Sequence, residues 1–388
     1  MIAMKCEELF KKVDELFPQY VKVLEDVCNI ESPTNYKEGV DEVCRYFVKM
    51  AEKRGWDIEI SKQEVAGDAA CITLNPNAKG APVCLSGHID TVQPRGIFGY
   101  PPVKIDGDIM YGPGTTDCKG GCVAGFLAMD ALCQVGFTDR PVKFIIQSDE
   151  ETSSKQSGKK TIEFMCEKAK GAVAFLNTEG LALANQHKLV LRRKGILRLK
   201  YNITGKAAHS SRCTQGINAI AEAAHKIIEL EKMKDEDTIT FNCGVIEGGT
   251  VGNTVPEKCS FILDIRFSND EEEKTARDFA NKVCDTSYIE GTKCEIEEVS
   301  YRPSMPHTDT NIQLFDKVNE IFEANGLEKR EMWYSPGGSD AAYITQKGIP
   351  CLDNIGVVGG EIHSKDEYTY ISSLATSAKC MSAIIMCI

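Results

Sequence analysis

Histidine and carboxylate side chains follow short apolar segments of this sequence at spacings that suit metal or acid–base chemistry. His88 comes directly after the apolar run at residues 83–85, and Asp90 is two positions further on. A carboxylate at that spacing can lie on the same side as the imidazole and hold it in one tautomer. Taken alone, a His-x-Asp pair is more typical of a hydrogen-bonded turn histidine, so the neighbouring segments decide its meaning.

A glycine-rich segment at residues 112–121 presents Asp117 from a turn that precedes a predicted helix. A phosphate-binding loop would show the Walker sequence or the Gly-x-Gly-x-x-Gly dinucleotide fingerprint, and neither is present. The acidic residues Asp149, Glu150 and Glu151 follow another apolar run and crowd the end of one predicted strand. Such carboxylates repel one another when they are desolvated, which favours either protonation or bound cations.

Two more residues of ligand type occupy similar positions. Glu179 follows the apolar run at residues 173–176, and His363 lies after a late apolar segment at residues 350–355. Two imidazoles with three carboxylates suit zinc, or cobalt or manganese in the same ligand field, whereas calcium and magnesium rarely select histidine. Each acid alone could be a solvated surface charge, but the whole set predicts a metal site at the edge of a sheet.

The elements that must position these residues alternate between helices and strands. Two amphipathic helices are predicted at residues 4–30 and 37–54, and short apolar runs separated by helical segments follow up to residue 176. This alternation predicts an α/β domain with a largely parallel sheet. From about residue 195 the predicted order changes to β-α-β-β-α-β, which is typical of a ferredoxin-like domain. We therefore predict a discontinuous catalytic domain at 1–193 and 303–388, interrupted by an inserted domain at 194–302.

Composition limits the possible partners and surroundings. The 388 residues include 45 basic and 57 acidic side chains, which gives a formal charge of −12 and argues against nucleic-acid or anionic-membrane partners. No apolar stretch reaches the roughly 20 residues that span a bilayer, and we predict a cytoplasmic protein. The 17 cysteines are scattered without a Cys-x-x-Cys pair, so most are expected to be small buried apolar residues.

Together these motifs resemble those of the M20 family of dinuclear zinc peptidases and amidohydrolases. The residues that carry the resemblance are His88-x-Asp90, Gly112-x-Gly114-x-x-Asp117-x-Lys119, Asp149-Glu150-Glu151, Glu179 and His363. The resemblance implies a zinc-binding α/β domain with an inserted lid that usually dimerises. It further implies that Asp117 bridges two metal ions, most simply zinc, and that the peptide bond after it is cis. The remaining implied ligands are His88 and Glu179 on one ion, and Glu151 and His363 on the other, with Glu150 as the general base on the bridging water.

The inserted domain offers candidate substrate contacts. From the sequence alone, His209 and Asn253 lie in turns and Arg266 is a solvent-facing strand residue. The resemblance to carboxypeptidases of the family implies that His209 contacts the reacting carbonyl from the partner subunit, while Asn253 and Arg266 bind the substrate carboxylate. Gly337, Gly338 and Ser339 resemble the substrate loop of the family.

Two departures from the family pattern concern the pocket and leave the ligands unchanged. Pro113 stands where arginine is usual, and residues 152–154 replace a common glycine. Substrate preference is therefore harder to predict than metal chemistry.

We predict a homodimeric hydrolase of amide bonds beside a free carboxylate, acting on small peptides in the manner of glutamate carboxypeptidases. The alternatives are an N-acyl-amino-acid deacylase or desuccinylase, and a di- or tripeptide aminopeptidase. Glu179 favours the first two, because aminopeptidase members tend to carry aspartate there. A metal-binding protein without turnover is disfavoured, because Glu150 and every expected ligand are present.

Overall fold

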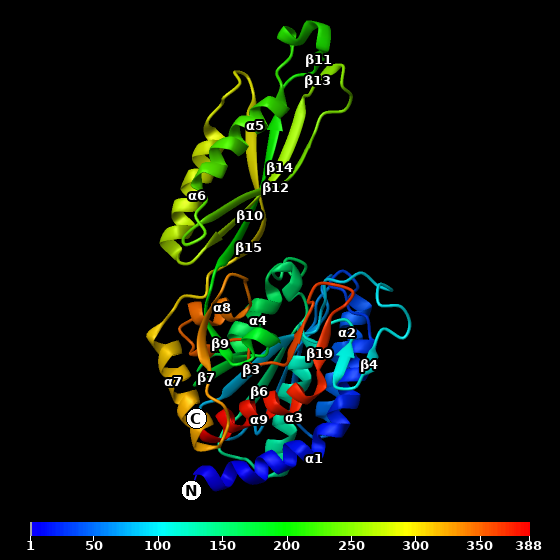
Figure 1. Cartoon of the computed structure of the whole chain (residues 1–388), viewed down its shortest axis with the longest axis vertical. Coiled ribbons are helices and arrows are strands. Elements are labelled where there is room, and N and C mark those ends of the chain that lie inside the picture. Colours follow the sequence, from blue (N-terminus) through cyan, green and yellow to red (C-terminus); the bar gives the residue numbers. More distant parts are fainter. Residues whose placement is uncertain (1) are drawn as a thin grey trace. The chain divides into compact units, whose positions relative to one another are not determined.

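The structure is a computed structural model that describes residues 2–388, with side chains from Cys6 onward. It divides into two compact units (Figure 1). Unit 1 contains residues up to 191 together with 307–334 and 343–388, and unit 2 contains 192–306 and 335–342. The sequence placed 335–342 in the catalytic domain, whereas the structure groups this segment with the insertion.

A six-stranded sheet forms the centre of unit 1, in the order β1-β2-β6-β3-β7-β17. Its strands are β1 (Asp57–Ser61), β2 (Ala69–Leu74), β3 (Val83–His88), β6 (Val142–Gln147), β7 (Ala174–Asn177) and β17 (Cys351–Leu352). Strands β6, β3, β7 and β17 run parallel, and β2 and β1 add antiparallel at one side. The register places His88 beside Gln147, so the carboxyl ends of β3 and β6 lie at one edge of the sheet.

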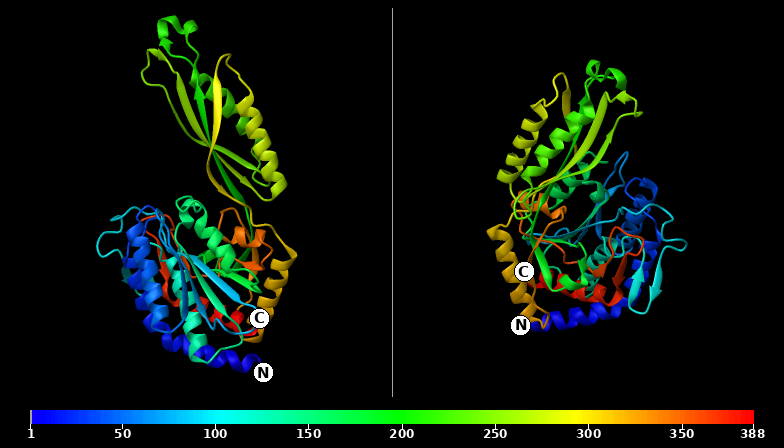
Figure 2. Two further views of the ribbon diagram at one scale, coloured as in Figure 1. Left: turned by 180° about the vertical axis from the view of Figure 1, so that it is seen from behind. Right: turned by 45° about the horizontal axis from the view of Figure 1, so that its top comes forward.

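Helices of unit 1 cover this sheet and each other. They are α1 (Ile2–Asn29), α2 (Lys37–Glu52), α3 (Lys119–Gln134), α4 (Lys160–Lys168), α7 (Asp309–Ala324) and α9 (Ile371–Cys387). Helix α3 is buried from Lys119 to Leu132, because it lies against β3 and β6 and also contacts α1 and α9. Figure 2 shows α1 (blue) and α9 (red) side by side, with the two chain termini near each other. Helix α3 is thus fixed on all sides, and its first residues follow directly after Asp117.

A second sheet of short strands was not predicted from the sequence. Its order is β4-β5-β19-β18-β8, with β4 (Lys104–Asp106), β5 (Ile109–Tyr111), β8 (Leu181–Ala182), β18 (Val358–Gly360) and β19 (Tyr368–Tyr370). Strand β8 begins two residues after Glu179, and His363 lies in the connection between β18 and β19. This small sheet therefore brings two distant candidate ligands to the same part of unit 1. Strands β9 (Lys188–Arg193) and β16 (Glu331–Ser335) form a further pair.

Unit 2 has the predicted β-α-β-β-α-β order. Its main elements are β10 (Gly195–Thr204), α5 (Ala219–Leu230), β12 (Thr240–Gly248), β14 (Lys258–Phe267), α6 (Asp270–Asp285) and β15 (Lys293–Arg302). The strands form one antiparallel sheet in the order β12-β14-β10-β15, and a separate core of residues such as Tyr201, Phe261 and Leu263 lies between this sheet and the helices. The predicted fold class, an α/β domain with an inserted ferredoxin-like lid, is confirmed.

None of the helices within residues 2–388 combines the length and the apolar composition that crossing a membrane requires.

Candidate metal centre

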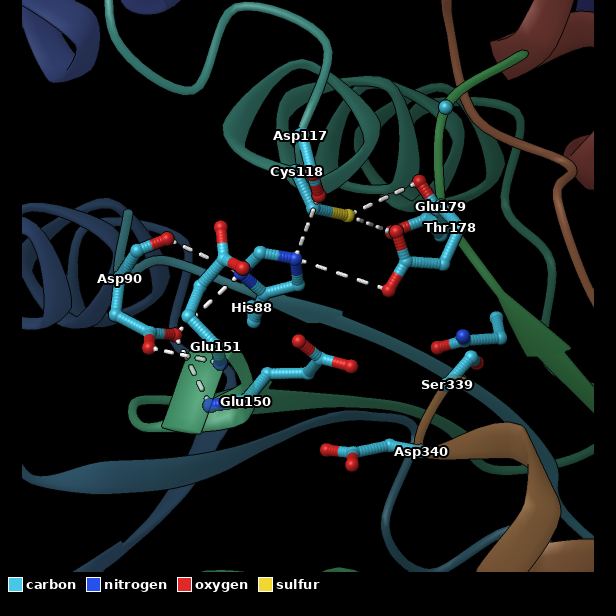
Figure 3. Close-up of polar contacts among 12 residues, drawn as sticks. His88, Asp90, Asp117, Cys118, Glu150, Glu151, Thr178, Glu179, Ser339 and Asp340 are labelled. Atoms are coloured by element: carbon cyan, nitrogen blue, oxygen red, sulfur yellow. Dashed lines mark hydrogen bonds and ion pairs between the residues drawn. The ribbon is translucent and has the colours of Figure 1, made fainter. Parts of the chain in front are cut away.

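His88 ends strand β3 and faces carboxylates on both sides of its imidazole (Figure 3). Its Nε2 lies 2.9 Å from Oδ1 of Asp117 and 3.7 Å from Oε1 of Glu179. Its Nδ1 lies 3.4 Å from Oδ1 of Asp90 and 3.1 Å from the Asp90 carbonyl oxygen. The ring is only 2% exposed, so these oxygens determine its orientation and protonation.

Asp90 links the imidazole to the acidic turn after β6. Its two carboxylate oxygens accept hydrogen bonds from the backbone N–H groups of Glu150 and Glu151, each at 3.2 Å. The Thr34 hydroxyl donates a third bond at 2.7 Å. The carboxylate is fully buried, and its bonds fix where the side chains of Glu150 and Glu151 start. Asp90 therefore acts as a positioning residue between two parts of the site.

Asp117 is shared by the two histidines. Its Oδ1 faces His88, and its Oδ2 lies 3.1 Å from Nε2 of His363, which is itself 3.3 Å from Oε2 of Glu151. The predicted residues His88, Asp117, Glu151, Glu179 and His363 are thus brought together by side-chain distances of 2.9–3.7 Å. The implied cis peptide bond between Asp117 and Cys118 is also present.

Glu150 lies beside the cluster. Figure 3 shows its side chain pointing into the space bordered by His88, Glu151 and Glu179. Its charge contributes to raising the pKa of both neighbouring glutamates, and only 7% of the residue is exposed. This is a position from which a carboxylate can exchange a proton with a molecule held by the cluster.

Burial and mutual repulsion shift the ionisation of the cluster. Burial and then the charge of Asp117 raise the pKa of Glu151 to about 8, and burial raises that of Glu179 well above its usual value. Contacts with Asp117 and Glu151 raise the pKa of His363 to about 10. Burial opposes ionisation of Asp117, but hydrogen bonds with His363 and His88 outweigh it and lower the pKa. The protein alone therefore retains protons at this site that a cation would displace.

The donor set fits divalent metal ions. Ligand atoms of His88, Asp117 and Glu151 lie within 4.8 Å of one another, and so do those of His88, Cys118 and Glu179. Among the side chains from Cys6 onward, no lysine or arginine forms an ion pair with Asp117, Glu151 or Glu179. Metal ions would thus supply the positive charge that the buried carboxylates otherwise lack. The Cys118 thiol, which the sequence analysis did not select, donates to the Thr178 carbonyl at 3.2 Å.

Glu367 is a functional residue that the sequence analysis missed. Its carboxylate is fully buried and accepts hydrogen bonds from the backbone N–H groups of Gly114, Thr116 and Asp117 at 2.9–3.1 Å. Gln93 donates a fourth bond at 2.7 Å. Burial, followed by the charge of Asp117, raises the pKa of Glu367 to about 7 in spite of these bonds. Its place four residues after His363 was the available signal, and its role is to hold the loop that presents Asp117.

Close backbone packing completes the placement of that loop. A Cβ atom on Gly121, in the first turn of α3, would lie 1.8 Å from the Thr178 carbonyl oxygen. Only glycine allows α3 to approach the end of β7 so closely. Asp117 and Glu179 are thereby brought to the same imidazole.

The candidate residues of unit 2 lie in two separate places. His209 ends the short strand β11 (Ala208–His209), which pairs with β13 (Thr254–Val255), and the Ser210 N–H donates to the Asn253 carbonyl at 2.9 Å. Arg266 is instead near the far end of β14, where Nε lies 2.7 Å from Oδ1 of Asp264. At about 3.3 Å per residue, the eight steps from the start of β14 to Arg266 span roughly 26 Å. The structure therefore does not bring Arg266 to His209 and Asn253 within one copy of unit 2.

The predicted substrate loop is held inside unit 2. The Arg193 guanidinium donates to the carbonyl oxygens of Gly337 at 3.1 Å and Gly338 at 3.4 Å. The Ser339 hydroxyl accepts from the Ala341 N–H at 3.1 Å, at the start of α8 (Ala341–Gln346). These contacts explain why residues 335–342 group with the insertion.

Known proteins with similar sequences and folds were found over nearly the whole chain. The sequence is 28% identical to carboxypeptidase G2 of Pseudomonas sp. (strain RS-16), over 97% of this chain and 91% of that protein. A tripeptidase from Staphylococcus aureus has a similar fold, with a TM-score of 0.76, 21% identity, and coverage of 95% of this chain and 98% of that one. A Bacillus subtilis protein described as a dinuclear metal binding peptidase of the M20 family also has a similar fold, with a TM-score of 0.70 and 16% sequence identity. The match covers 96% of this chain and 98% of that one.

An α/β unit with imidazoles and carboxylates gathered at its sheet edge, together with an inserted antiparallel domain, fits the class of metallopeptidases. The pattern of peptidase family M20/M25/M40 matches residues 84–386 of the sequence. The chain belongs to this family, as its motifs predicted.

Proposed function

We propose that this protein is a dizinc hydrolase that cleaves amide bonds beside a free carboxylate, in the manner of a glutamate carboxypeptidase. The observation that carries the proposal is the convergence of His88, Glu151, Glu179 and His363 around the shared carboxylate of Asp117. Similarity to carboxypeptidase G2 over 97% of the chain supports the choice of substrate class. The cytoplasmic location stays a prediction.

Two metal sites can share this donor set. His88 and Glu179 would hold one ion, Glu151 and His363 the other, and Asp117 would contact both because each of its oxygens faces a different imidazole. When bound, a pair of divalent cations activates water and polarises the scissile carbonyl as a Lewis acid. Zinc is the metal that we propose, with cobalt and manganese compatible with the same ligands.

Glu150 is the proposed general base. Its carboxylate would accept the proton of the attacking water and return it to the amine that leaves as the amide bond breaks. Asp90 contributes by holding the backbone of Glu150 and the ring of His88 in place. Ordered surroundings of this kind keep the reacting groups in the geometry of the transition state.

The substrate carboxylate is assigned to Arg266 and Asn253. Because these residues lie at opposite ends of unit 2, we propose that one substrate meets Arg266 of one subunit and Asn253 with His209 of the partner. Unit 2 has a suitable surface for such a dimer, because the edge strand β12 exposes Val245 and Ile246, and α5 exposes Ile228. Gly337, Gly338 and Ser339 would line the path of the substrate.

Turnover by the zinc-loaded protein tests the proposal most directly. Dipeptides ending in glutamate should be hydrolysed, and the same peptides with an amidated C-terminus should be poor substrates. Acetyl- and succinyl-amino acids test the deacylase alternative, and tripeptides with a free amine but a blocked C-terminus test the aminopeptidase alternative, which the fold similarity to a tripeptidase keeps open. Equal cleavage of free and amidated peptides would contradict the carboxypeptidase assignment.

A further inference from the structure

A cavity of about 300 Å³ lies in unit 1, lined by residues that do not belong to the candidate metal centre. Its walls come from β8, β9, β18, α9 and the segment before β16. Apolar side chains from three of these strands, including Leu181, Leu189 and Val358, form part of the wall, while Arg330 contributes a guanidinium and Cys380 a buried thiol. The volume is at the lower end of the range for sites that hold small organic molecules.

Arg330 brings a positive charge to this cavity that the surrounding side chains do not neutralise. Its Nη2 lies 3.5 Å from the Cys380 sulfur, and its guanidinium carbon lies 5.8 Å from the centre of the Phe322 ring. In the described part of the chain, no carboxylate forms an ion pair with it. The nearby carboxylate of Glu328, which also lines the cavity, is 2.9 Å from Nδ1 of His187.

The backbone of Arg330 is fixed in place. The Asn319 side chain accepts from the Arg330 N–H at 2.8 Å and donates to the Arg330 carbonyl at 3.1 Å. The contacts of the guanidinium with Cys380 and Phe322 restrict the side chain further. A guanidinium held in this way can bind a carboxylate through two parallel hydrogen bonds.

Two serine hydroxyl groups in the wall are already engaged in hydrogen bonds. Ser373 donates to the Tyr370 carbonyl and Ser377 to the Gly356 carbonyl, each at 2.6 Å. Their donors are therefore not available to orient a polar ligand. Beyond Arg330 a ligand would meet a mixed wall, in which Leu181, Leu183, Leu189, Ile355 and Val358 supply an apolar part that can receive an apolar group.

We propose that this cavity is a second binding site, for a small organic carboxylate with an apolar body, and that its occupancy is coupled to the metal centre. The coupling would pass through shared backbone. The N–H of Gly356 donates to the Glu179 carbonyl at 3.0 Å, and that of Leu181 donates to the Val357 carbonyl at 2.9 Å. Gly356 and Leu181 both line the cavity, so a ligand there contacts the segment that holds Glu179.

Calorimetric titration with 4-phenylbutyrate tests the site. The carboxylate should bind both the zinc-loaded and the chelator-treated protein, whereas the neutral 4-phenylbutyramide should bind at least about tenfold more weakly. Inorganic phosphate serves as a plain anion. If phosphate binds as well as 4-phenylbutyrate, or the amide equals the acid, the proposed ligand class is wrong.

Variants locate the binding. Arg330→Gln should weaken the binding of 4-phenylbutyrate at least tenfold. Leu183→Glu should also weaken its binding, because it places a negative charge on an exposed residue of the cavity wall without disturbing the core. Arg266→Gln is the matched control, because Arg266 belongs to the proposed substrate site, and it should leave this affinity within twofold. Unchanged binding in both cavity variants, or loss in Arg266→Gln alone, would overturn the proposal without affecting the proposed function.

The coupling between the cavity and the metal centre is tested by a separate measurement. By thermodynamic linkage, a ligand whose binding affects the segment that holds Glu179 must bind the zinc-loaded and the zinc-free protein with different affinities. We expect the dissociation constants of 4-phenylbutyrate in these two forms to differ at least threefold in the wild type. Equal constants would contradict the coupling and leave an independent binding site.

Discussion

The two units of this protein arrange their candidate functional residues in opposite ways. Unit 1 gathers side chains from four distant segments around one carboxylate, that of Asp117. Unit 2 keeps His209, in the two-stranded sheet of β11 and β13, apart from Arg266 near the far end of β14, each with a local partner, Ser211 and Asp264 respectively. A single copy of unit 1 thus brings all five predicted ligands together, whereas a single copy of unit 2 keeps its candidate residues in two separate places.

The difference shows which region contains buried like charges that must be held together. The carboxylates of the cluster in unit 1 repel one another, and burial together with these like charges raises the pKa of Glu151 and Glu179. It persists because Asp90 and Glu367 fix the backbone around it with multiple hydrogen bonds. Nothing comparable surrounds His209, which is exposed and bonded to its own turn. The first region is organised before a ligand arrives, whereas the second, in our proposal, is completed by another copy.

The largest expected effect separates base from ligand within unit 1. Glu150→Gln should lower kcat by roughly a hundredfold or more, because it removes the proton acceptor, while zinc content stays near two per chain. Glu151→Gln should instead lower zinc affinity. Steady-state kinetics and elemental analysis measure the two quantities. Full turnover by Glu150→Gln would show that this carboxylate is not the base.

The next test asks whether unit 2 acts across copies. His209→Ala homodimers should be nearly inactive, and so should Glu150→Gln homodimers. A heterodimer of the two should regain about one working site, because intact Glu150 of one subunit meets intact His209 of the other. Activity of purified heterodimers decides the matter, and light scattering verifies their mass. Persistent inactivity would mean that His209 serves its own subunit or none.

A smaller effect is expected for Arg266, which lies in unit 2 far from His209. Arg266→Ala should lower kcat/KM for free-carboxylate substrates roughly thirtyfold, which corresponds to about 2 kcal/mol of lost transition-state binding. This value is at the low end of the range for removing one partner of a buried charge pair. The low end applies because Asp264 already engages Arg266 and the side chain is 25% exposed. Arg198→Ala is the control, because Arg198 binds the same Asp264 at 2.7 Å. Equal losses in both variants would argue for a structural role.

Removing the metal should make the thermal stability of the protein depend on pH, because the repelling carboxylates of unit 1 then bind protons. Without metal, folded Glu151 and His363 hold protons more tightly than in the unfolded chain, with pKa values of about 8 and about 10. The stabilisation that this provides is present at low pH and is lost as pH rises, so the Tm of chelated protein should fall by roughly a few degrees between pH 6.5 and 9. Zinc should reverse the trend, and Glu151→Gln should flatten it. Calorimetric scans in matched buffers provide the measurement.

The smallest effect concerns the turn that carries Glu150 and Glu151. Ser153 has φ of 55°, a left-handed conformation in which glycine is less strained, and the family commonly has glycine in this segment. Ser153→Gly should stabilise the protein by about 0.5 kcal/mol, since relief of strain exceeds the added entropy of the unfolded chain. Ala375→Gly within α9 should instead destabilise it by about 1 kcal/mol. Urea denaturation distinguishes the two signs.

The sequence predicted those parts of the molecule that depend on local pattern. Apolar runs identified the parallel strands, and their polar ends identified His88, Glu151 and Glu179. A glycine-rich turn before a predicted helix identified Asp117. The β-α-β-β-α-β order of unit 2 followed from periodicity and strand length. Strands such as β8 and β18 were missed, because two or three residues carry no periodicity and are defined only by their distant partners.

Side-chain networks across long sequence separations were also beyond local pattern. Glu367 resembles any acidic surface residue until the N–H groups of residues 114–117 are seen to surround it. The grouping of residues 335–342 with unit 2 depends on the Arg193 side chain, some 140 positions earlier. The separation of Arg266 from Asn253 follows from the length of β14, which the sequence did predict, but the consequence for one substrate site requires the sheet topology.

The placement of unit 2 inside the sequence of unit 1 has a consequence for biosynthesis. Four of the five candidate ligands precede residue 180, but His363 and the buried Glu367 are translated only after the whole insertion. A chain emerging from the ribosome therefore lacks one imidazole and the carboxylate that holds the loop of Asp117, although its N-terminal strands can already pair. By the proposed function, hydrolytic competence would therefore arise only after residues 363 and 367 have been translated and have joined the N-terminal part of unit 1.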